Sequence, residues 1–356
     1  MSDDLNHAGQ TALALLAAAP VGPRPDRTGD AGAVRDRIGA ALLAWSARVT
    51  TAPDILTDPL RRWQHLVSAG RTDTVLGRLA EADLDARVIA AEAGRDPVAH
   101  ATYGVWASQS GRTGVTATPH DSGWDLHGLL RFCSGAHLLD RALITARTPT
   151  GDLLLVDVDL ADHGVRPLEN TWRAVGMDAS DSGDVRLEHV QVDADAVIGP
   201  VDFYLTRPGF PIGGIGVAAV WWGASYGLYE AAADGLRATE ADDHQSAHLG
   251  ALTVSFESSA ALLVGTAGVL AHLNRAALDR QALVCRSAVD AVVEQTVRRV
   301  PRITGPVPAS RDAGFAHRLA DLPVYVRQHH AERDLAALGR TELSRTQPAR
   351  TEPNRS

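Results

Sequence analysis

The chain has 356 residues, which is enough for two or three hydrophobic cores and too many for one small module. Its formal net charge is −9, and no run of arginines suggests the basic surface of a nucleic-acid-binding protein. No lysine is present, so mechanisms that need a Schiff-base lysine or a phosphate-loop lysine are excluded. Two cysteines far apart in the chain exclude a disulfide framework.

The N-terminus, MSDDLNHAGQ, is acidic and lacks the basic stretch of a signal peptide. The longest apolar run, residues 212–228, is too short and too rich in glycine to be read as a membrane-spanning helix. Together with the isolated cysteines, these features predict a cytoplasmic protein that has neither a membrane nor a nucleic acid as its partner.

Residues 1–100 are predicted to form an N-terminal helical domain. Apolar residues recur there at helical spacings of three and four, as at Ile38 and Leu42 and again at Val75 and Leu79. Prolines divide this region into short helices.

Residues 101–208 change to a period of two, with Trp124, Leu126 and Leu130 alternating with other residues. Glycines fall between and within the expected strands, as turns and bulges do. Several short strands at this spacing predict a central antiparallel β-domain, either a barrel or a sandwich.

Residues 209–340 return to helical spacing and predict a C-terminal four-helix bundle. Residues 341–356 are polar, lack an apolar period and are predicted to be a disordered tail. The fold class is therefore α+β. The four bundle helices are expected near residues 217–238, 243–273, 279–300 and 313–338.

Two features of the bundle are explained without a ligand. Trp221 and Trp222 belong to an aromatic patch on one helix, which is expected in the core or at an interface between subunits. His244 and His248 have the spacing of metal ligands on a helix, but a third ligand is missing nearby, so no metal is expected.

Three motifs of the β-zone resemble the acyl-CoA dehydrogenase family. One is a Gly-aromatic strand that leads into an aromatic-x-Ser-Gly turn, another is a Gly-Met segment with its following strand, and the third is the exit of that strand. Their order and spacing make the resemblance more specific than a single Gly-rich loop would be. The motifs read GWDLHGLLRFCSGA at residues 123–136, GMDASDSGDVRLEHVQV at 176–192 and ADAVIG at 194–199.

The resemblance implies a flavin site. A flavin ring needs an aromatic or aliphatic plate and a few hydrogen bonds along its polar edge. By this resemblance Phe132 stacks on the isoalloxazine ring, and the hydroxyl of Ser134 bonds near N5. The cofactor implied is FAD. FMN is also open, because the sequence RATE at residues 237–240 replaces the Arg-x-x-Phe motif expected for the adenine end.

Residues 103–108 match the first flavin-binding strand of the family, where backbone groups and a hydroxyl bind the pyrimidine edge. On this basis the flavin-binding residues are expected to include Tyr103, Val105, Trp106 and Ser108. Trp106 stands where a small hydroxyl residue is usual, so Ser108 and Ser110 are the hydroxyls available.

The catalytic glutamate of the family is not found. One of its two usual positions is occupied by Val217, and counting along the chain puts His329 at the other, within one residue. The base is therefore absent, or His329 or His330 replaces it, since a neutral imidazole can act as a base near pH 7. Glu332 and Asp334 are the carboxylate candidates if the register slips. The alternative is that residues 328–334 form an ordinary polar helix face with no catalytic role.

These features predict a flavin-dependent oxidoreductase that acts on a small molecule or on an acyl thioester. Two alternatives stay open: a flavin-dependent monooxygenase of the same fold, and a degenerate, non-catalytic member that binds a ligand or scaffolds a partner. The resemblance also implies a homodimer or a homotetramer. The electron acceptor is not indicated by the sequence.

Overall fold

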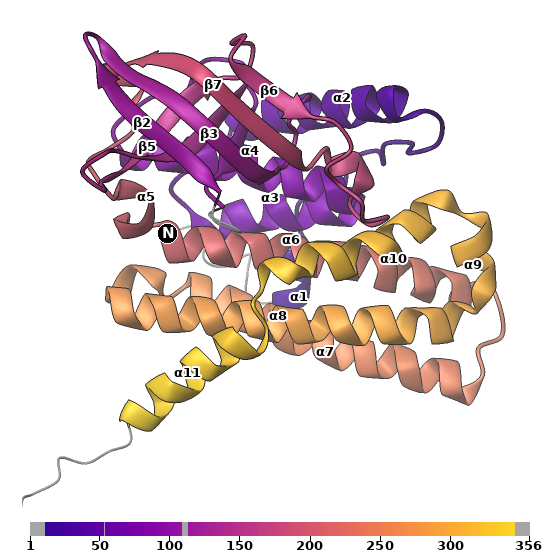
Figure 1. Ribbon diagram of the computed structural model, residues 1–356. Helices are drawn as coiled ribbons and strands as arrows, with labels where there is room; N and C mark the ends of the chain where they lie inside the picture. The colour runs from indigo at the N-terminus through magenta and orange to yellow at the C-terminus, as the bar shows by residue number, and fades with distance from the viewer. Residues whose placement is uncertain (1–10, 53, 109–112, 346–356) are drawn as a thin grey trace, which may run out of the picture.

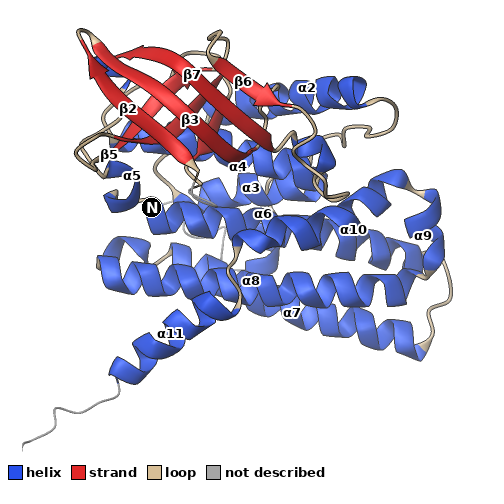
Figure 2. Cartoon of the chain, in the orientation of Figure 1, coloured by secondary structure: helices blue, strands red, loops and turns tan. Residues whose placement is uncertain are grey.

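The computed structural model describes residues 11–52, 54–108 and 113–345 (Figure 1). Helices and strands follow the predicted order, with helices first, then strands, then helices. Figure 2 shows the strands gathered at one end of the molecule, with α2 at their level and the C-terminal helices beneath them. The α+β fold class is therefore confirmed.

Three of the four N-terminal helices, α2, α3 and α4, begin at an aspartate cap. Asp73 ends α3 and starts α4, because its carboxylate accepts hydrogen bonds from the amides of Val75 and Leu76. The cap is almost completely buried, which fixes the corner between the two helices. The four helices are α1 Ala12–Leu16, α2 Ala31–Thr50, α3 Pro59–Thr72 and α4 Thr74–Glu92.

The strands form one seven-stranded sheet in the order β1-β4-β2-β3-β7-β6, with β5 paired to β4. The sheet is not antiparallel throughout, as the alternation alone had suggested, because β4 runs parallel to both β1 and β2. The strands are β1 Tyr103–Trp106, β2 Gly114–His120, β3 Gly123–Cys133, β4 Arg141–Arg147, β5 Leu153–Asp159, β6 Val165–Leu168 and β7 Gly183–Asp193.

The C-terminal helices and the N-terminal helices share one hydrophobic core. The central helix α6 places Trp221 and Trp222 in it with no exposed surface, so this aromatic patch belongs to the core. The remaining helices are α5 Phe203–Thr206, α6 Phe210–Arg237, α7 Asp243–Ala267, α8 Arg275–Thr304, α9 Pro306–Arg311, α10 Ala313–Tyr325 and α11 Glu332–Arg345.

The last predicted helix, residues 313–338, is two helices. Helix α10 ends at Tyr325, a short 3-10 turn covers Val326–Gln328, and α11 begins at Glu332. The chain turns because His329 is extended and Ala331 has a left-handed φ of 43°. Helix α11 then leaves the helical body (Figure 1). It continues to Arg345, so residues 341–345 are helical rather than part of a disordered tail.

Helix α7 is the one described helix that is long and apolar enough to cross a membrane, with a mean hydropathy of 1.3. This is weak evidence, because core helices of soluble proteins have the same property. Asp242 and Gln245 form a capping box at its start, which is an ordinary helix N-terminus.

Candidate active site

A large cavity lies where the end of the β-sheet meets helices α4, α6, α8 and α10. Its volume is about 1110 Å³, which exceeds the usual range for a site that holds a single small molecule. Its wall is mostly apolar, with a few polar side chains from distant parts of the sequence. The cavity can therefore hold a cofactor ring and a substrate together.

Phe132 lines this cavity near the end of β3. The pairing of β3 with β7 is irregular between Leu130 and Cys133, and Phe132 has a φ of 61°, which is rare for an aromatic residue. The side chain is 53% exposed, although large aromatic side chains are usually buried. The strand therefore turns an aromatic plate toward the cavity instead of into the core.

Ser134 follows on the same wall and is buried except for the surface that faces the cavity. The indole Nε1 of Trp106 donates a hydrogen bond of 3.1 Å to the backbone oxygen of Ser134. The hydroxyl of Ser134 lies 2.8 Å from that of Ser182, which also lines the cavity. The two predicted residues Phe132 and Ser134 are thus brought together, and Trp106 supports them from behind.

Three of the four flavin-binding residues predicted in residues 103–108 line this cavity. Val105, Trp106 and Ser108 line the cavity, whereas Ser110 lies outside the described residues. Tyr103 is not among the residues that line this cavity, so its contact with a flavin stays a prediction. Its side chain is buried in a small hydrophobic cluster with Ile89 and Leu155, against which Val105 also packs.

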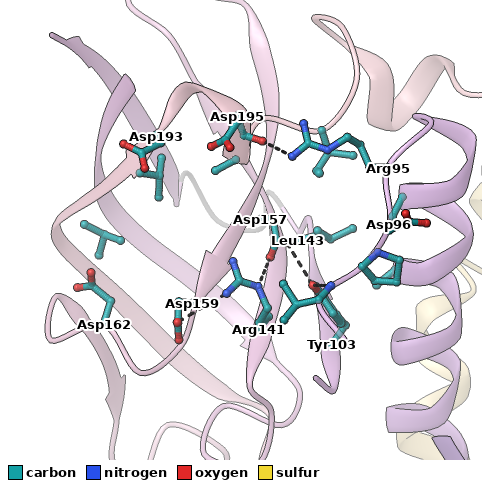
Figure 3. Close-up of a pocket in the computed structure, with 18 of the residues that line it drawn as sticks. Arg95, Asp96, Tyr103, Arg141, Leu143, Asp157, Asp159, Asp162, Asp193 and Asp195 are labelled. Carbon is teal, nitrogen blue, oxygen red and sulfur yellow. Dashed lines mark hydrogen bonds and ion pairs between the residues drawn. The ribbon is translucent and has the colours of Figure 1, made fainter. Parts of the chain in front are cut away.

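Tyr103 instead lines a second, smaller cavity of about 350 Å³ (Figure 3). Its hydroxyl donates to Asp157 at 3.2 Å and accepts from the amide of Val98 at 2.9 Å. Arg141 holds the same carboxylate at 2.8 Å. Burial nevertheless raises the pKa of Asp157, with Arg141 opposing this rise.

Among the described residues, no group of three or more His, Cys, Asp or Glu side chains is placed to hold a metal ion.

One polar cluster of the large cavity was missed by the sequence reasoning. Arg78 and Glu81 of α4 form a buried ion pair on its wall, and Tyr325 at the end of α10 lies beside them. Burial raises the pKa of Glu81, and the nearby Arg78 opposes this rise. The hydroxyl of Tyr325 has no hydrogen-bond partner among the described residues. The cluster therefore offers a carboxyl and a phenol to a ligand.

The two candidate histidines are separated by the turn before α11. His329 is 3% exposed and does not line the cavity. Its Nε2 lies 3.1 Å from the Ser287 hydroxyl, and its Nδ1 lies 3.3 Å from Asp290. The side chain of His329 therefore lies against α8, and its role as a base stays a prediction.

His330 lines the cavity together with Asp334. The backbone amide of His330 donates to the Asp334 carboxylate at 3.1 Å, and its Nδ1 lies 3.6 Å from the same group. Glu332 is not part of the cavity wall. At the α6 position where the family has its glutamate, the wall is formed by Val217. The cavity thus has an imidazole and a carboxylate at one end, and an apolar side chain on α6.

Known proteins match this chain in sequence over part of its length and in structure over most of it. No family model matches the chain. A dibenzothiophene monooxygenase of Rhodococcus qingshengii is 30% identical over 132 residues, which is 33% of this chain and 31% of that protein. The chain therefore matches about a third of the length of this curated relative, and the relative's activity does not pass to it by this match alone.

Solved structures match most of the chain. The FMN-bound monooxygenase TdsC from Paenibacillus sp. A11-2 has a TM-score of 0.75 and 19% identity, covering 95% of both chains. Butyryl-CoA dehydrogenase from Megasphaera elsdenii has a TM-score of 0.70 and 14% identity, covering 88% of this chain and 90% of that one. The resemblance carried by the β-zone motifs is confirmed at the level of structure: the chain has the acyl-CoA dehydrogenase fold.

Proposed function

We propose that this protein is a flavin-dependent oxidoreductase, with the flavin ring in the large cavity against Phe132 and with its N5 edge near Ser134. The observation that carries the proposal is the exposed side chain of Phe132, whose backbone has a left-handed φ. It lies two residues before Ser134, and both line the cavity of about 1110 Å³. An aromatic plate beside a polar atom is what a flavin ring requires. When bound, the flavin supplies two-electron redox chemistry that the side chains alone do not have.

We further propose FMN as the cofactor in place of the FAD implied by the sequence resemblance. The solved structure of TdsC with FMN matches 95% of the chain. The sequence also lacks the motif expected for the adenine end of FAD. Release of the cofactor from the purified protein and its chromatography against both standards distinguishes the two.

Among flavin enzymes, we propose a monooxygenase that acts on a small, largely apolar molecule. The curated relatives that match the chain are dibenzothiophene monooxygenases. In addition, Val217 leaves α6 without a carboxylate at one of the two positions where acyl-CoA dehydrogenases keep their catalytic glutamate. The balanced reaction takes a substrate RH, oxygen and reduced flavin to ROH, water and oxidised flavin.

In this reaction the residues of the chain would bind, orient and exchange protons. The apolar wall excludes water from the substrate. The hydroxyl of Tyr325, on the cavity wall beside Glu81, would donate to a polar atom of the substrate. His330, whose backbone amide donates to Asp334, would donate or accept a proton at the substrate.

A dehydrogenase is the second candidate, and one observation favours it. The pKa of the buried Glu81 is raised, as expected of a carboxyl that acts as a general base. In that case an acyl thioester would reduce an electron-acceptor dye under argon, and Glu81→Gln would abolish this. We also propose that the protein is cytoplasmic and forms a homodimer or a homotetramer.

Incorporation of labelled oxygen into the product tests the monooxygenase proposal. Protein with reduced FMN and indole or dibenzothiophene should yield a product that carries one atom of ¹⁸O from ¹⁸O₂, detected by mass spectrometry. Replacing a proton-transfer group typically costs a factor of about 10²–10⁴ in rate, so His330→Ala should lower product formation at least tenfold. The matched control is His163→Ala, an exposed histidine on the loop before β6. Dye reduction by acyl thioesters without labelled product would contradict the proposal.

A further inference from the structure

A row of three serine hydroxyls leads from the cavity wall into the protein. The hydroxyl of Ser134 lies 2.8 Å from that of Ser182, which in turn lies 2.7 Å from that of Ser180. The Ser180 hydroxyl donates a hydrogen bond of 2.6 Å to the backbone oxygen of Met177. All three serines are at least nine-tenths buried, and Ser134 and Ser182 line the cavity.

The direction of these hydrogen bonds is fixed by counting protons. A hydroxyl has one hydrogen to donate, whereas a carbonyl oxygen can only accept. Ser180 must use its hydrogen on Met177, since two bare oxygens 2.6 Å apart would repel. Ser182 must then donate to Ser180, and Ser134 must donate to Ser182. The hydrogen of Ser134 therefore points into the protein, and its lone pairs are left for the cavity.

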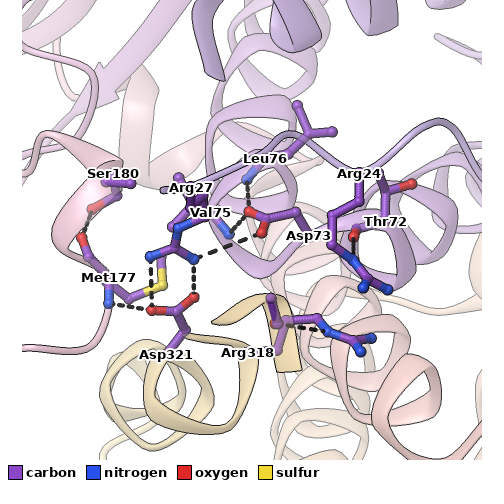
Figure 4. A network of polar contacts seen from close by, with 12 residues as sticks. Arg24, Arg27, Thr72, Asp73, Val75, Leu76, Met177, Ser180, Arg318 and Asp321 are labelled. Carbon is purple, nitrogen blue, oxygen red and sulfur yellow. Dashed lines mark hydrogen bonds and ion pairs between the residues drawn. The ribbon is translucent and has the colours of Figure 1, made fainter. Parts of the chain in front are cut away.

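The accepting end of this row is held rigidly. Met177 has a left-handed φ of 60°, and its amide donates to Asp321 at 2.6 Å. Asp321 is itself paired with the buried Arg27 (Figure 4). The network spans the N-terminal segment, α10 and the loop between β6 and β7. Because the Met177 carbonyl cannot easily rotate, the row of hydrogen bonds cannot easily reverse.

We propose that Ser180 and Ser182 are positioning residues that fix the Ser134 hydroxyl as a hydrogen-bond acceptor and make the site selective for reduced flavin. This rests on the proposed function, which puts flavin N5 near Ser134. Reduced flavin carries a hydrogen on N5 and can donate it to Ser134. Oxidised flavin has only a lone pair at N5, so it would meet the lone pairs of Ser134. An unmade hydrogen bond of a buried group is costly, and this cost falls on the oxidised form alone.

A purely structural role for the serines predicts a different result. If they only hold the loop between β6 and β7 in place, their loss should weaken the binding of both redox forms alike. If they orient Ser134, their loss should change the ratio of the two dissociation constants, because a freed Ser134 hydroxyl can donate to oxidised N5. The ratio of the dissociation constants for oxidised and reduced FMN therefore distinguishes the positioning role from the structural role.

The test is an anaerobic titration of the full chain with FMN, in its oxidised form and in its dithionite-reduced form, followed by protein fluorescence. The wild type should bind reduced FMN more tightly. Ser182→Ala should lower this preference by about fivefold or more, as expected for one neutral hydrogen bond. Ser182→Cys, with a weakly accepting thiol, should act in the same direction if the alanine variant folds poorly. Ser182→Thr keeps a hydroxyl at this position and should retain the preference for reduced FMN.

Two further variants make the test specific. In the background of Ser134→Ala, the additional change Ser182→Ala should leave the ratio unaltered, because Ser182 acts through Ser134. Thr171→Ala removes a different hydroxyl of the same loop, which accepts from the backbone amide of Asp184 at 2.8 Å, and should also leave the ratio unaltered.

The outcomes separate the two proposals. Equal affinity of the wild type for both redox forms, or an unchanged ratio in Ser182→Ala, overturns the role of the serines while leaving the flavin site intact. An equal effect of Thr171→Ala assigns the change to a loosened loop and also overturns it. Binding of neither form by the wild type overturns the proposed function itself, and this inference with it.

Discussion

Two buried arginines illustrate how differently one residue type can be accommodated in this protein. Arg27 is surrounded by the carboxylates of Asp73, Asp178 and Asp321. Arg318 is 1% exposed, and its Nη1 has no hydrogen-bond partner among the described residues. Burial lowers the pKa of Arg318 to about 10, with the positive charge of Arg24 adding to the effect. Arg27 is thus paired directly with carboxylates, whereas Arg318 donates to the Gly314 carbonyl and is offset only by more distant acidic groups.

Replacing these arginines by methionine should therefore have opposite effects. A lowered arginine pKa means that folding penalises the charged form, and the penalty is fully present at neutral pH and is relieved as the pH rises above about 10. Arg318→Met removes this penalty and should leave the free energy of unfolding at pH 7 unchanged or raise it.

Arg27→Met, the matched comparison, leaves buried carboxylates unpaired and should lower the free energy of unfolding by about 3–5 kcal/mol. Urea denaturation of both variants at pH 7 measures the two effects. A loss of stability in Arg318→Met as large as that in Arg27→Met would show that the buried charge of Arg318 is compensated after all.

The residues of the site differ in how far sequence alone could identify them. Phe132 and Ser134 belong to a local motif, so their spacing along one strand was enough. Glu81 and Arg78 lie on a helix rich in alanine and leucine, where charged residues three apart usually form a solvated face. Only the packing of α4 beneath the sheet buries them. His329 and His330 are adjacent, and one turn of backbone decides which of them reaches the cavity.

At the level of elements, helices α3 and α6 pack with their backbones in direct contact. A Cβ atom on Gly223 of α6 would lie 2.2 Å from the Val67 carbonyl oxygen, and one on Gly70 of α3 would lie 2.4 Å from that of Val220. Glycine is thus required at this crossing for space and not for its backbone conformation. Gly235, on the same helix α6, faces open space.

Alanine at these two glycines of α6 should accordingly have opposite effects. Gly223→Ala forces the helices apart and should destabilise the protein by about 1–3 kcal/mol. Gly235→Ala removes the flexibility of an exposed helical glycine and should stabilise it by about 0.5–1 kcal/mol. Thermal denaturation of the two variants measures both effects. A neutral Gly223→Ala would mean that the close packing of α3 on α6 is not maintained in solution.

The elements that sequence predicted best are those with a local cause. The period of two and the placement of glycines predicted the β-zone, and helical spacing predicted α6 to α8. The parallel pairing of β1 with β4 depends on which strand lies beside it, and no local pattern records that. The break before α11 falls at Ala331, where neither glycine nor proline marks the left-handed backbone.

For the molecule as a whole, the site exists only in the assembled fold. The β-domain supplies the ring-facing wall with Phe132 and Ser134, helix α4 supplies Glu81, and the C-terminal helices supply Tyr325 and His330. The N-terminal and C-terminal helices also share one core. A sequence motif can identify the wall that one strand builds, whereas the opposite wall is set by how distant helices pack.

The most direct test of this account is a crystal structure of the protein with FMN bound under reducing conditions. The account predicts the isoalloxazine ring in the large cavity, against the Phe132 side chain, with N5 within hydrogen-bond distance of the Ser134 hydroxyl. A flavin bound elsewhere, or a cavity that stays free of flavin at saturating FMN, would contradict it.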